Sequence, residues 1–405
     1  MINVGCQMEY KNELRKNISK NYIFTFLKEF KVTNGIWMIY LASKGLTLTE
    51  LGAVEAIFHI TSFLMEIPTG AVADMWGRKA SRIWGRIGQL ISALILIYSN
   101  SLFGFAIGFI VSALSYNLES GAGEALIYDS LKEIGDEKKY MKISGANEVI
   151  MQASQTFGLL LGGFLSNYSY VYAYAVSIVV SFLSIIQALS FKEPDIKIEI
   201  EEKSFKTFKN QVRESFKIIA QNKKLGFLIV FSQAIFMFNT SIFFYFQNYL
   251  LEKGVSKGNI GIILAASSLA AVITASQTHK IEKKIGERII ILLLPLIISI
   301  CIWGVALSKY YYVFFIVINA IESIIFIAVS DYTNKLIPSD KRATILSMGS
   351  MIFSLYMIAV FPLIGKLGDL YSLQFSFKVL AVMATIMAII NIIILGRNKK
   401  VNQKE

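Results

Sequence analysis

The sequence predicts an all-α polytopic membrane protein with twelve transmembrane helices in two pseudo-symmetric six-helix halves. Three observations support this: the composition is apolar, the apolar residues come in long runs, and the basic residues lie between the runs. The chain has 405 residues, of which 55% are hydrophobic and 17% charged, and its mean hydropathy is +0.55. A soluble chain would carry about 25% charged residues, so much of this chain must be shielded from water.

Twelve segments are long and apolar enough to cross a bilayer. A helix needs about 20 mostly apolar residues to cross about 30 Å of hydrocarbon. Nearly unbroken apolar runs, such as 289–300 and 379–390, favour helices over the alternating strands of a membrane barrel. The predicted spans cover residues 22–42, 49–72, 83–99, 102–125, 146–166, 171–191, 225–250, 258–278, 289–307, 312–331, 344–364 and 375–395.

The basic residues predict the orientation. If both termini are cytoplasmic, most of the 40 lysines and arginines lie inside, and the outer segments hold only Lys44, Lys253, Lys257, Lys309 and Lys366. This bias follows the positive-inside rule. We therefore expect a multi-pass protein of the cell (inner or plasma) membrane with both termini in the cytoplasm. The excess of basic residues then reflects topology, and no nucleic-acid partner is expected.

The spans divide into two groups of six. We predict an N-terminal half over residues 1–191, a charged cytoplasmic linker over 192–224 and a C-terminal half over 225–405. The tripeptide Leu-Glu-Ser around Glu119 in the fourth span matches Ile-Glu-Ser around Glu322 in the tenth. Two repeats with a binding site between them are the architecture of many carriers.

The loop after the second span carries a recognisable motif. Residues Gly70 to Lys79 read GAVADMWGRK, which resembles the signature G-x-x-x-D-x-x-G-R-K of the major facilitator superfamily. The resemblance, together with twelve spans and a central linker, implies that family's fold and a secondary transporter working by alternating access. It also implies that Asp74 and Arg78, with Gly77 and Lys79 beside them, stabilise the outward-facing state through contact between the halves.

Two further segments are similar to elements of proton-linked members of that family. Span 4, from Asn117 to Ala125, is similar to R-x-x-Q-G-x-G-x-A, but Asn117 stands where the arginine belongs. Span 5 contains Ser154, Gly158 and Gly162 and is similar to the drug-antiporter motif G-x-x-x-G-P-x-x-G-G, without its first glycine and its proline. The motifs therefore lean towards the drug:proton antiporters, and their departures leave nutrient uptake open.

Ionisable residues inside the second span form a stripe. With about 100° between successive helical residues, Glu55, His59, Ser62 and Glu66 fall within about 60° of one another. Histidine titrates near neutral pH and a desolvated acid is protonated more readily, so the stripe could carry protons. Solvated helix ends would also explain Glu55 and Glu66.

Other charges lie in spans 1, 4 and 10. A charge in a span costs about 2.5–3.5 kcal/mol on insertion scales, so such residues face water or a partner. Lys28 and Lys31 could snorkel to the surface; alternatively, Lys28 or Glu29, both proton-coupling candidates, pairs with acids on spans 2 or 4. Glu119 and Glu322, near mid-span, are further proton-coupling candidates.

Aromatic and amide side chains in the second half suit an amphipathic organic ligand, although lipid-facing rings give the same composition. The substrate-cavity candidates are Asn117, Gln233, Asn239, Tyr245, Gln247 and Asn319.

Other function classes lack their motifs. There is no H-E-x-x-H, no G-x-S-x-G and no P-loop, so neither an enzyme nor an ATP-driven pump is expected. With two histidines and two cysteines we expect no metal site and no cofactor. The duplicated plan favours a carrier over a channel, and a transporter-like sensor stays open. We expect a monomer that exports small amphipathic or drug-like compounds in exchange for protons. The alternative is a proton-coupled uptake symporter for a small nutrient or metabolite.

Overall fold

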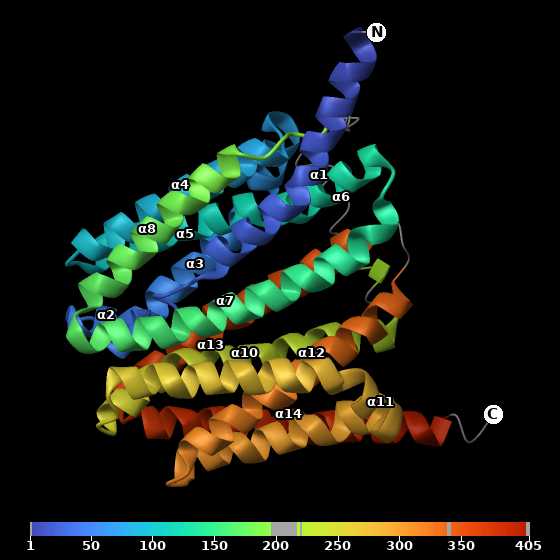
Figure 1. Ribbon diagram of the computed structural model, residues 1–405. Helices are drawn as coiled ribbons and strands as arrows, with labels where there is room; N and C mark the ends of the chain where they lie inside the picture. Colours follow the sequence, from blue (N-terminus) through green and yellow to red (C-terminus); the bar gives the residue numbers. More distant parts are fainter. Residues whose placement is uncertain (1, 196–216, 219–220, 338–341, 402–405) are drawn as a thin grey trace. The chain divides into compact units, whose positions relative to one another are not determined.

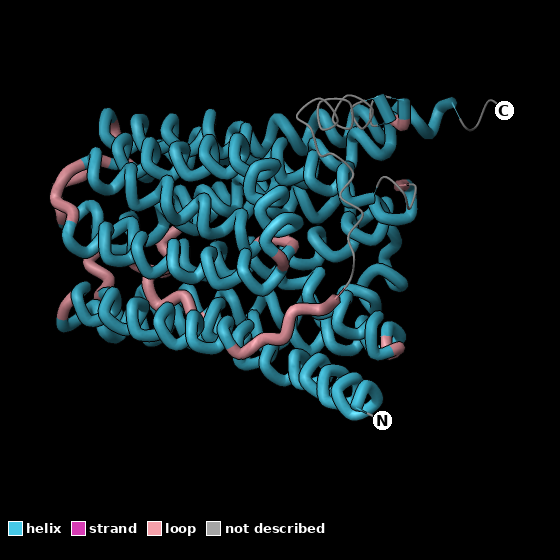
Figure 2. The backbone as a smooth tube through the Cα atoms, turned by 90° about the horizontal axis from the view of Figure 1, so that it is seen from above, coloured by secondary structure: helices cyan, strands magenta, loops and turns pink. Residues whose placement is uncertain are grey.

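The computed structural model describes residues 2–195, 217–218, 221–337 and 342–401, and every regular element in these ranges is helical (Figures 1 and 2). The elements are α1 (Ile2–Glu29), α2 (Trp37–Ser43), α3 (Leu48–Trp76), α4 (Arg78–Tyr98), α5 (Leu102–Glu119), α6 (Ala122–Ile134), the 3₁₀ turn η1 (Glu137–Lys139), α7 (Tyr140–Tyr168), α8 (Tyr170–Leu189), α10 (Lys223–Glu252), α11 (Lys257–Leu307), α12 (Tyr311–Leu336), α13 (Arg342–Leu370) and α14 (Leu373–Val401).

The helices confirm the predicted fold class. Ten helices of the described chain are long and apolar enough to cross a membrane. One of them, α11, contains both the eighth and the ninth predicted spans, which are separated at Gly286, where the backbone leaves the helical conformation (φ 77°, ψ 159°). The first predicted span is divided, since α1 ends at Glu29 and α2 begins at Trp37. The fourth is divided between α5 and α6 at Gly121, whose φ is +76°.

The chain forms two compact units. Unit 1 comprises Met1–Trp37 and Ile57–Lys209, and unit 2 comprises Met38–Ala56 and Asn210–Glu405. In unit 1, α4 packs on α5 and α8, and α1 packs on α6, α7 and α8. In unit 2, α10 packs on α12, α13 and α14, and α11 packs on α12 and α14. The predicted half boundaries at 191 and 225 remain a prediction, and most of the predicted linker lies outside the described residues.

The outer surfaces of the helices fit a lipid environment. Large apolar side chains stand exposed along them, for example Phe103, Phe157 and Ile300, each more than half exposed. Inside unit 1, a core cluster around Phe24, Leu131 and Phe191 joins α1, α6 and the end of α8. A smaller cluster around Leu225 and Ile345 begins the core of unit 2. A protein with apolar surfaces of this extent on so many helices needs the hydrocarbon of a bilayer around it.

Candidate functional site

The non-helical backbone that interrupts the first span packs directly against Gly158 and Gly162 of α7. A Cβ on Gly158 would lie 3.1 Å from the backbone N of Lys31, and one on Gly162 would overlap the carbonyl oxygen of Val32. Ser154, in the place of the first motif glycine, donates a hydrogen bond of 2.6 Å to the Phe26 carbonyl. The span-5 motif therefore lets non-helical backbone approach α7 closely, as small residues do in membrane proteins.

Glu29, the last residue of α1, is buried and paired. Its carboxylate oxygens lie 3.3 Å from Lys28 Nζ and 3.1 Å from Lys31 Nζ. Gln155 of α7 donates a further hydrogen bond of 2.9 Å to it. Two cations and an amide therefore compensate the desolvation of this carboxylate.

Glu119 lies where the fourth span breaks, and it is also paired. The Nε of Arg82, from α4, lies 3.3 Å from Glu119 Oε1, and Lys28 Nζ lies 3.8 Å from the same oxygen. Lys28 thus faces Glu119 on span 4, the pairing that the sequence left open against a surface-facing lysine. Arg82 and Lys28 therefore supply Glu119 with cations, although Asn117 replaces the family arginine.

Arg82 is buried between two aromatic rings, a carboxylate and an amide. It is 2% exposed, and its guanidinium carbon lies 3.9 Å from the ring centre of Phe24 and 4.6 Å from that of Phe191. Its Nη2 donates to Asn21 Oδ1 at 2.9 Å. Rings and a carboxylate together make this a fixed cation rather than a mobile one. Sequence reasoning missed Arg82, because its position just before the third span reads as a cytoplasmic loop.

The four residues of the predicted stripe, Glu55, His59, Ser62 and Glu66, all lie in α3. Glu55 and His59 are buried and Glu66 is half-buried. Ser62, on the same stripe, donates to Asn117 Oδ1, and the Asn117 amide donates back to the Ser62 carbonyl, both at 2.7 Å. The side chain of Asn117, predicted to face a cavity, therefore links α5 to α3 through these two hydrogen bonds.

The signature loop turns at Gly77, where the chain needs glycine. Gly77 has φ +93° between α3 and α4, a region that L residues rarely adopt. The Glu193 carboxylate accepts hydrogen bonds from the backbone N–H groups of Arg78 (2.6 Å) and Lys79 (2.7 Å), which caps the start of α4. Arg78 Nε also lies 3.9 Å from Asp129 Oδ2.

For Gly70 and Asp74, the remaining positions of the signature loop, the structure describes the backbone. Gly70 and Asp74 lie within α3, and the side chain of Asp74 is outside the described part. The gating role that the family resemblance gives Asp74 therefore remains an expectation. In unit 2, Gly286 repeats the conformation of Gly77, with φ 77° and ψ 159° against 93° and 160°, which supports a duplication of the two turns.

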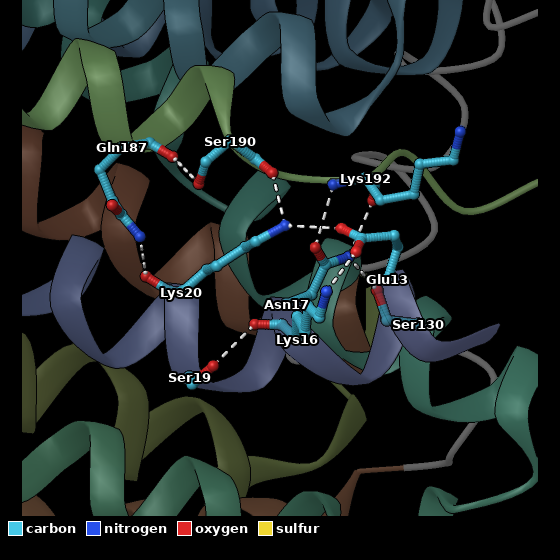
Figure 3. Close-up of polar contacts among 9 residues, drawn as sticks. All are labelled: Glu13, Lys16, Asn17, Ser19, Lys20, Ser130, Gln187, Ser190 and Lys192. Atoms are coloured by element: carbon cyan, nitrogen blue, oxygen red, sulfur yellow. Dashed lines mark hydrogen bonds and ion pairs between the residues drawn. The ribbon is translucent and has the colours of Figure 1, made fainter. Parts of the chain in front are cut away.

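The segment of residues 190–195, after α8, is hydrogen-bonded to α1, and Figure 3 shows these contacts at Ser190 and Lys192. The side chain of Asn17 is fully buried and bonds both the N–H (3.0 Å) and the carbonyl (2.8 Å) of Lys192. Lys20 Nζ donates to the Ser190 carbonyl at 2.6 Å. At the far end, Asp195 N donates to the Tyr10 hydroxyl at 2.7 Å. The backbone around Glu193 is thus fixed by α1.

In unit 2, three of the predicted residues come together between α10 and α12. Asn239 Nδ2 donates to Asn319 Oδ1 at 3.3 Å, and Asn319 Nδ2 donates to the Phe315 carbonyl at 2.9 Å. The Glu322 carboxylate, half-buried one turn beyond Asn319, interacts with the Asn239 amide. Within the described chain no cation pairs with Glu322, in contrast to Glu29 and Glu119.

The other predicted residues of α10 lie apart from this group. The buried Tyr245 hydroxyl donates to the Phe361 carbonyl at 2.9 Å and lies 3.2 Å from the Leu48 carbonyl. Gln247 is fully buried. Gln233 is half-buried, with its amide near Gly349. The structure thus brings Asn239, Asn319 and Glu322 together and leaves Tyr245, Gln247 and Gln233 elsewhere on the helix.

Asp369 is a second residue that the sequence did not single out. Its carboxylate accepts from the N–H groups of Leu48 (2.9 Å) and Thr49 (2.8 Å) and from the Thr49 hydroxyl (2.5 Å). It therefore caps the start of α3 within unit 2. Neither Asp369 nor Glu193 could be found from sequence, because each acts on a backbone far away in the chain.

The site has no group suited to a resident metal in its described part, since no three His, Cys, Asp or Glu side chains converge there. Taken unit by unit, unit 1 contains the two paired acids Glu29 and Glu119, and unit 2 contains Glu322, for which the described residues provide no cation. An embedded acid without a cation partner can bind and release a proton or a charged ligand without covalent chemistry.

Comparison with known proteins identifies the family of this chain. Residues 22–362 match the model of the Major Facilitator Superfamily. The chain is 24% identical over 369 residues to the MFS-type transporter YxaM of Bacillus subtilis (strain 168), covering 89% of this chain and 90% of that one. It is 20% identical over 389 residues to the MFS-type transporter MJ1560 of Methanocaldococcus jannaschii, covering 94% and 98%.

Solved structures share the fold. The nucleoside transporter NupG superposes with a TM-score of 0.76 at 14% identity, covering 95% of this chain and 99% of that one. The POT family transporter PepTSo gives a TM-score of 0.71 at 12% identity, with 96% and 98% covered. Because the family match runs from the first span into the eleventh, the chain belongs to the major facilitator superfamily, as a multi-pass membrane transporter of small molecules and not an enzyme.

Proposed function

We propose that this transporter is a proton-coupled exporter of small amphipathic or drug-like compounds, working by alternating access as a monomer in the cell membrane with both termini cytoplasmic. Proton coupling rests on one observation: Glu322 is a half-buried acid without a cation partner in the described chain. Desolvation without a compensating charge favours the protonated form of a carboxyl group, so Glu322 is suited to take up a proton and to release it when water or a ligand reaches it.

The other embedded acids are less suited to this role. Glu29 and Glu119 have cations at 3.1 to 3.8 Å, so each carboxylate is already engaged in ion pairs. We assign them to the scaffold of unit 1 and assign the mobile proton to Glu322. Glu55, His59 and Glu66 on α3 remain proton-coupling candidates.

Export is supported by the resemblance of spans 4 and 5 to the drug:proton antiporters. The second candidate is proton-coupled uptake of a small nutrient. It is favoured by Ser154, which replaces the first motif glycine and bonds the Phe26 carbonyl, and by the absence of the motif proline. NupG, a nucleoside transporter, resembles this chain in fold only.

The test is flux through purified protein in proteoliposomes under an imposed pH gradient, with a panel of drug-like compounds and a panel of nutrients. We expect net movement of drug-like compounds against their gradient, driven by protons moving the opposite way. Glu322→Gln keeps the shape of the side chain, removes its titration, and should lose the whole gradient-driven part of the flux.

The control is Glu252→Gln at the exposed end of the same helix as Asn239, which should transport as the wild type does. Flux that ignores the pH gradient in the wild type would end the coupling proposal. Substrate and protons moving in the same direction would replace export by uptake.

A further inference from the structure

The residues around Glu322 form two facing helix stripes. On α10 the stripe is Phe236, Asn239 and Phe243, and on α12 it is Phe315, Asn319, Glu322 and Phe326. Spacings of three and four place each set on one helix face. The stripes meet through Asn239 and Asn319, while Phe236 pairs with Phe326 (5.4 Å between ring centres) and Phe243 with Phe315 (6.3 Å). Aromatic pairs thus lie one turn to either side of the polar group.

Glu322 is the one charged residue of these two stripes. Between Lys224 and Glu252, α10 has no Asp, Glu, His, Lys or Arg, and between Lys309 and Asp331 Glu322 is alone. The other helix packed on α12 is α11, which meets this region through Thr274, bonded to Ser323 Oγ at 2.8 Å.

The titratable groups of α11 lie elsewhere. His279 is exposed. Glu282 interacts with the Tyr332 hydroxyl (3.4 Å), ten residues beyond Glu322. No described group on α10 or α11 therefore supplies a charge to Glu322.

The polar group formed by Asn239, Asn319 and Glu322 has more hydrogen-bond acceptors than donors. Asn239 is 7% exposed and its Oδ1 has no hydrogen-bond partner. The Glu322 carboxylate adds two acceptor oxygens. The donor available to them is Asn239 Nδ2, which is also engaged by Asn319 Oδ1. A buried acceptor without a donor costs free energy, so the group is complete only when something brings donors to it.

We propose that Glu322 and Asn239 bind the positively charged amino group of the substrate, and that the flanking phenylalanines hold the aromatic or apolar body attached to it. The substrate class is therefore an organic cation. This inference rests on the proposed function and deepens it. An ammonium group supplies several N–H donors and one positive charge, which match the carboxylate and the free Asn239 oxygen, and the ring faces favour a cation beside them.

In this geometry the proton and the substrate compete for the same carboxylate, that of Glu322. When Glu322 takes up a proton, its O–H can donate to Asn239 Oδ1, and the site becomes neutral and satisfied without substrate. When the ammonium group binds, the proton must leave. Exchange of one positive charge for another at a single carboxylate gives counter-transport with no covalent or redox step.

The experiment is equilibrium binding to the purified full-length protein in detergent. The probes are the aromatic amines phenethylamine and tryptamine, with the neutral alcohols phenethyl alcohol and tryptophol as matched controls. We expect the amines to bind about tenfold to hundredfold tighter than the alcohols, as for a charge-assisted hydrogen bond. Amine affinity should fall about tenfold for each pH unit below the pKa of the Glu322 carboxyl, because protons compete.

Two variants distinguish binding at Glu322 from nonspecific binding to apolar surface. Glu322→Gln should bind amines and alcohols alike and lose the dependence on pH, whereas Glu252→Gln should behave as the wild type. Equal binding of amines and alcohols by the wild type, absence of amine binding, or unchanged amine binding by Glu322→Gln would each overturn the proposal.

The outcome is distinguishable from failure of the proposed function. Gradient-driven flux of neutral compounds, without amine binding, would leave proton coupling intact and remove the cation site. Amine binding that depends on Glu322, together with flux that ignores the gradient, would keep the site and remove the coupling.

Discussion

Glu119 and Glu322 occupy matching tripeptides in the two halves of the sequence but have different surroundings. Glu119 ends α5 beside the guanidinium of Arg82 and the ammonium of Lys28. Glu322 lies inside the continuous helix α12 beside amides and rings. An acid inside a membrane span is costly at either position, and the difference in role that we propose comes from the neighbours that other helices provide.

Arg82 is the residue whose loss should damage unit 1 most. Both Arg82 and Glu119 are almost fully buried, and removing one partner of a buried pair leaves an uncompensated charge. We expect Arg82→Gln to lower the free energy of unfolding by about 3–5 kcal/mol. The measurement is thermal or denaturant unfolding of the purified protein in detergent.

The double variant Arg82→Met with Glu119→Leu provides the control for that prediction. Because it removes both charges, it should be more stable than Arg82→Gln alone. A double variant as unstable as the single one would show that packing of Arg82 between Phe24 and Phe191, and not the ion pair, is the stabilising contact.

At the scale of the helices, hydropathy predicted the spans but not the interruptions within them. The apolar runs were sufficient to place twelve spans, because the bilayer requires length and apolarity and little else. The break before Trp37 and the break at Gly121 lie in polar, glycine-containing stretches without proline, residues 28–35 and 117–124, and hydropathy alone did not identify them as breaks. The first depends on α7, where Gly158 and Gly162 leave room for the backbone of Lys31 and Val32, and such tertiary contacts are invisible in a single sequence.

The close approach at Gly162 can be tested by adding a methyl group. Because a Cβ on Gly162 would overlap the Val32 carbonyl oxygen, Gly162→Ala should displace the broken part of the first span and lower stability by about 1–3 kcal/mol, as overpacking does. Gly145→Ala, in the same helix with no neighbour within 4 Å, should be neutral or slightly stabilising. Unfolding in detergent compares the two, and equal effects would remove the close approach as the reason for Gly162.

For the whole molecule, α3 has a special position because it contributes to both compact units. Residues 38–56, which include the start of α3, belong to unit 2, whereas the rest of α3 belongs to unit 1. Within unit 2 the contact is tight: a Cβ on Gly52 would lie 2.6 Å from Pro362 Cα. Asp369 caps the helix there through Leu48 and Thr49. In carriers built from two repeats, transport moves one repeat against the other, so we predict that residues 38–56 leave unit 2 during the transport cycle.

If that movement is required, fixing the contact should stop transport. Thr49 and Asp369 are joined by a hydrogen bond of 2.5 Å, so Thr49→Cys with Asp369→Cys, in a background without Cys6 and Cys301, can form a disulfide. We expect oxidation to abolish flux in proteoliposomes and reduction to restore the flux of the reduced variant.

The matched control for this cross-link is Ser299→Cys with Thr385→Cys. These two hydroxyls lie 2.8 Å apart between α11 and α14 of the same unit, where no relative movement is expected, so oxidation of that pair should leave flux unchanged. Full transport by the oxidised Thr49→Cys, Asp369→Cys variant would mean that Asp369 only stabilises unit 2, and that substrate passes without release of α3. Loss of transport confined to that variant would make the cap on α3 a contact that each transport cycle must break, which is the behaviour expected of an element shared by two moving units.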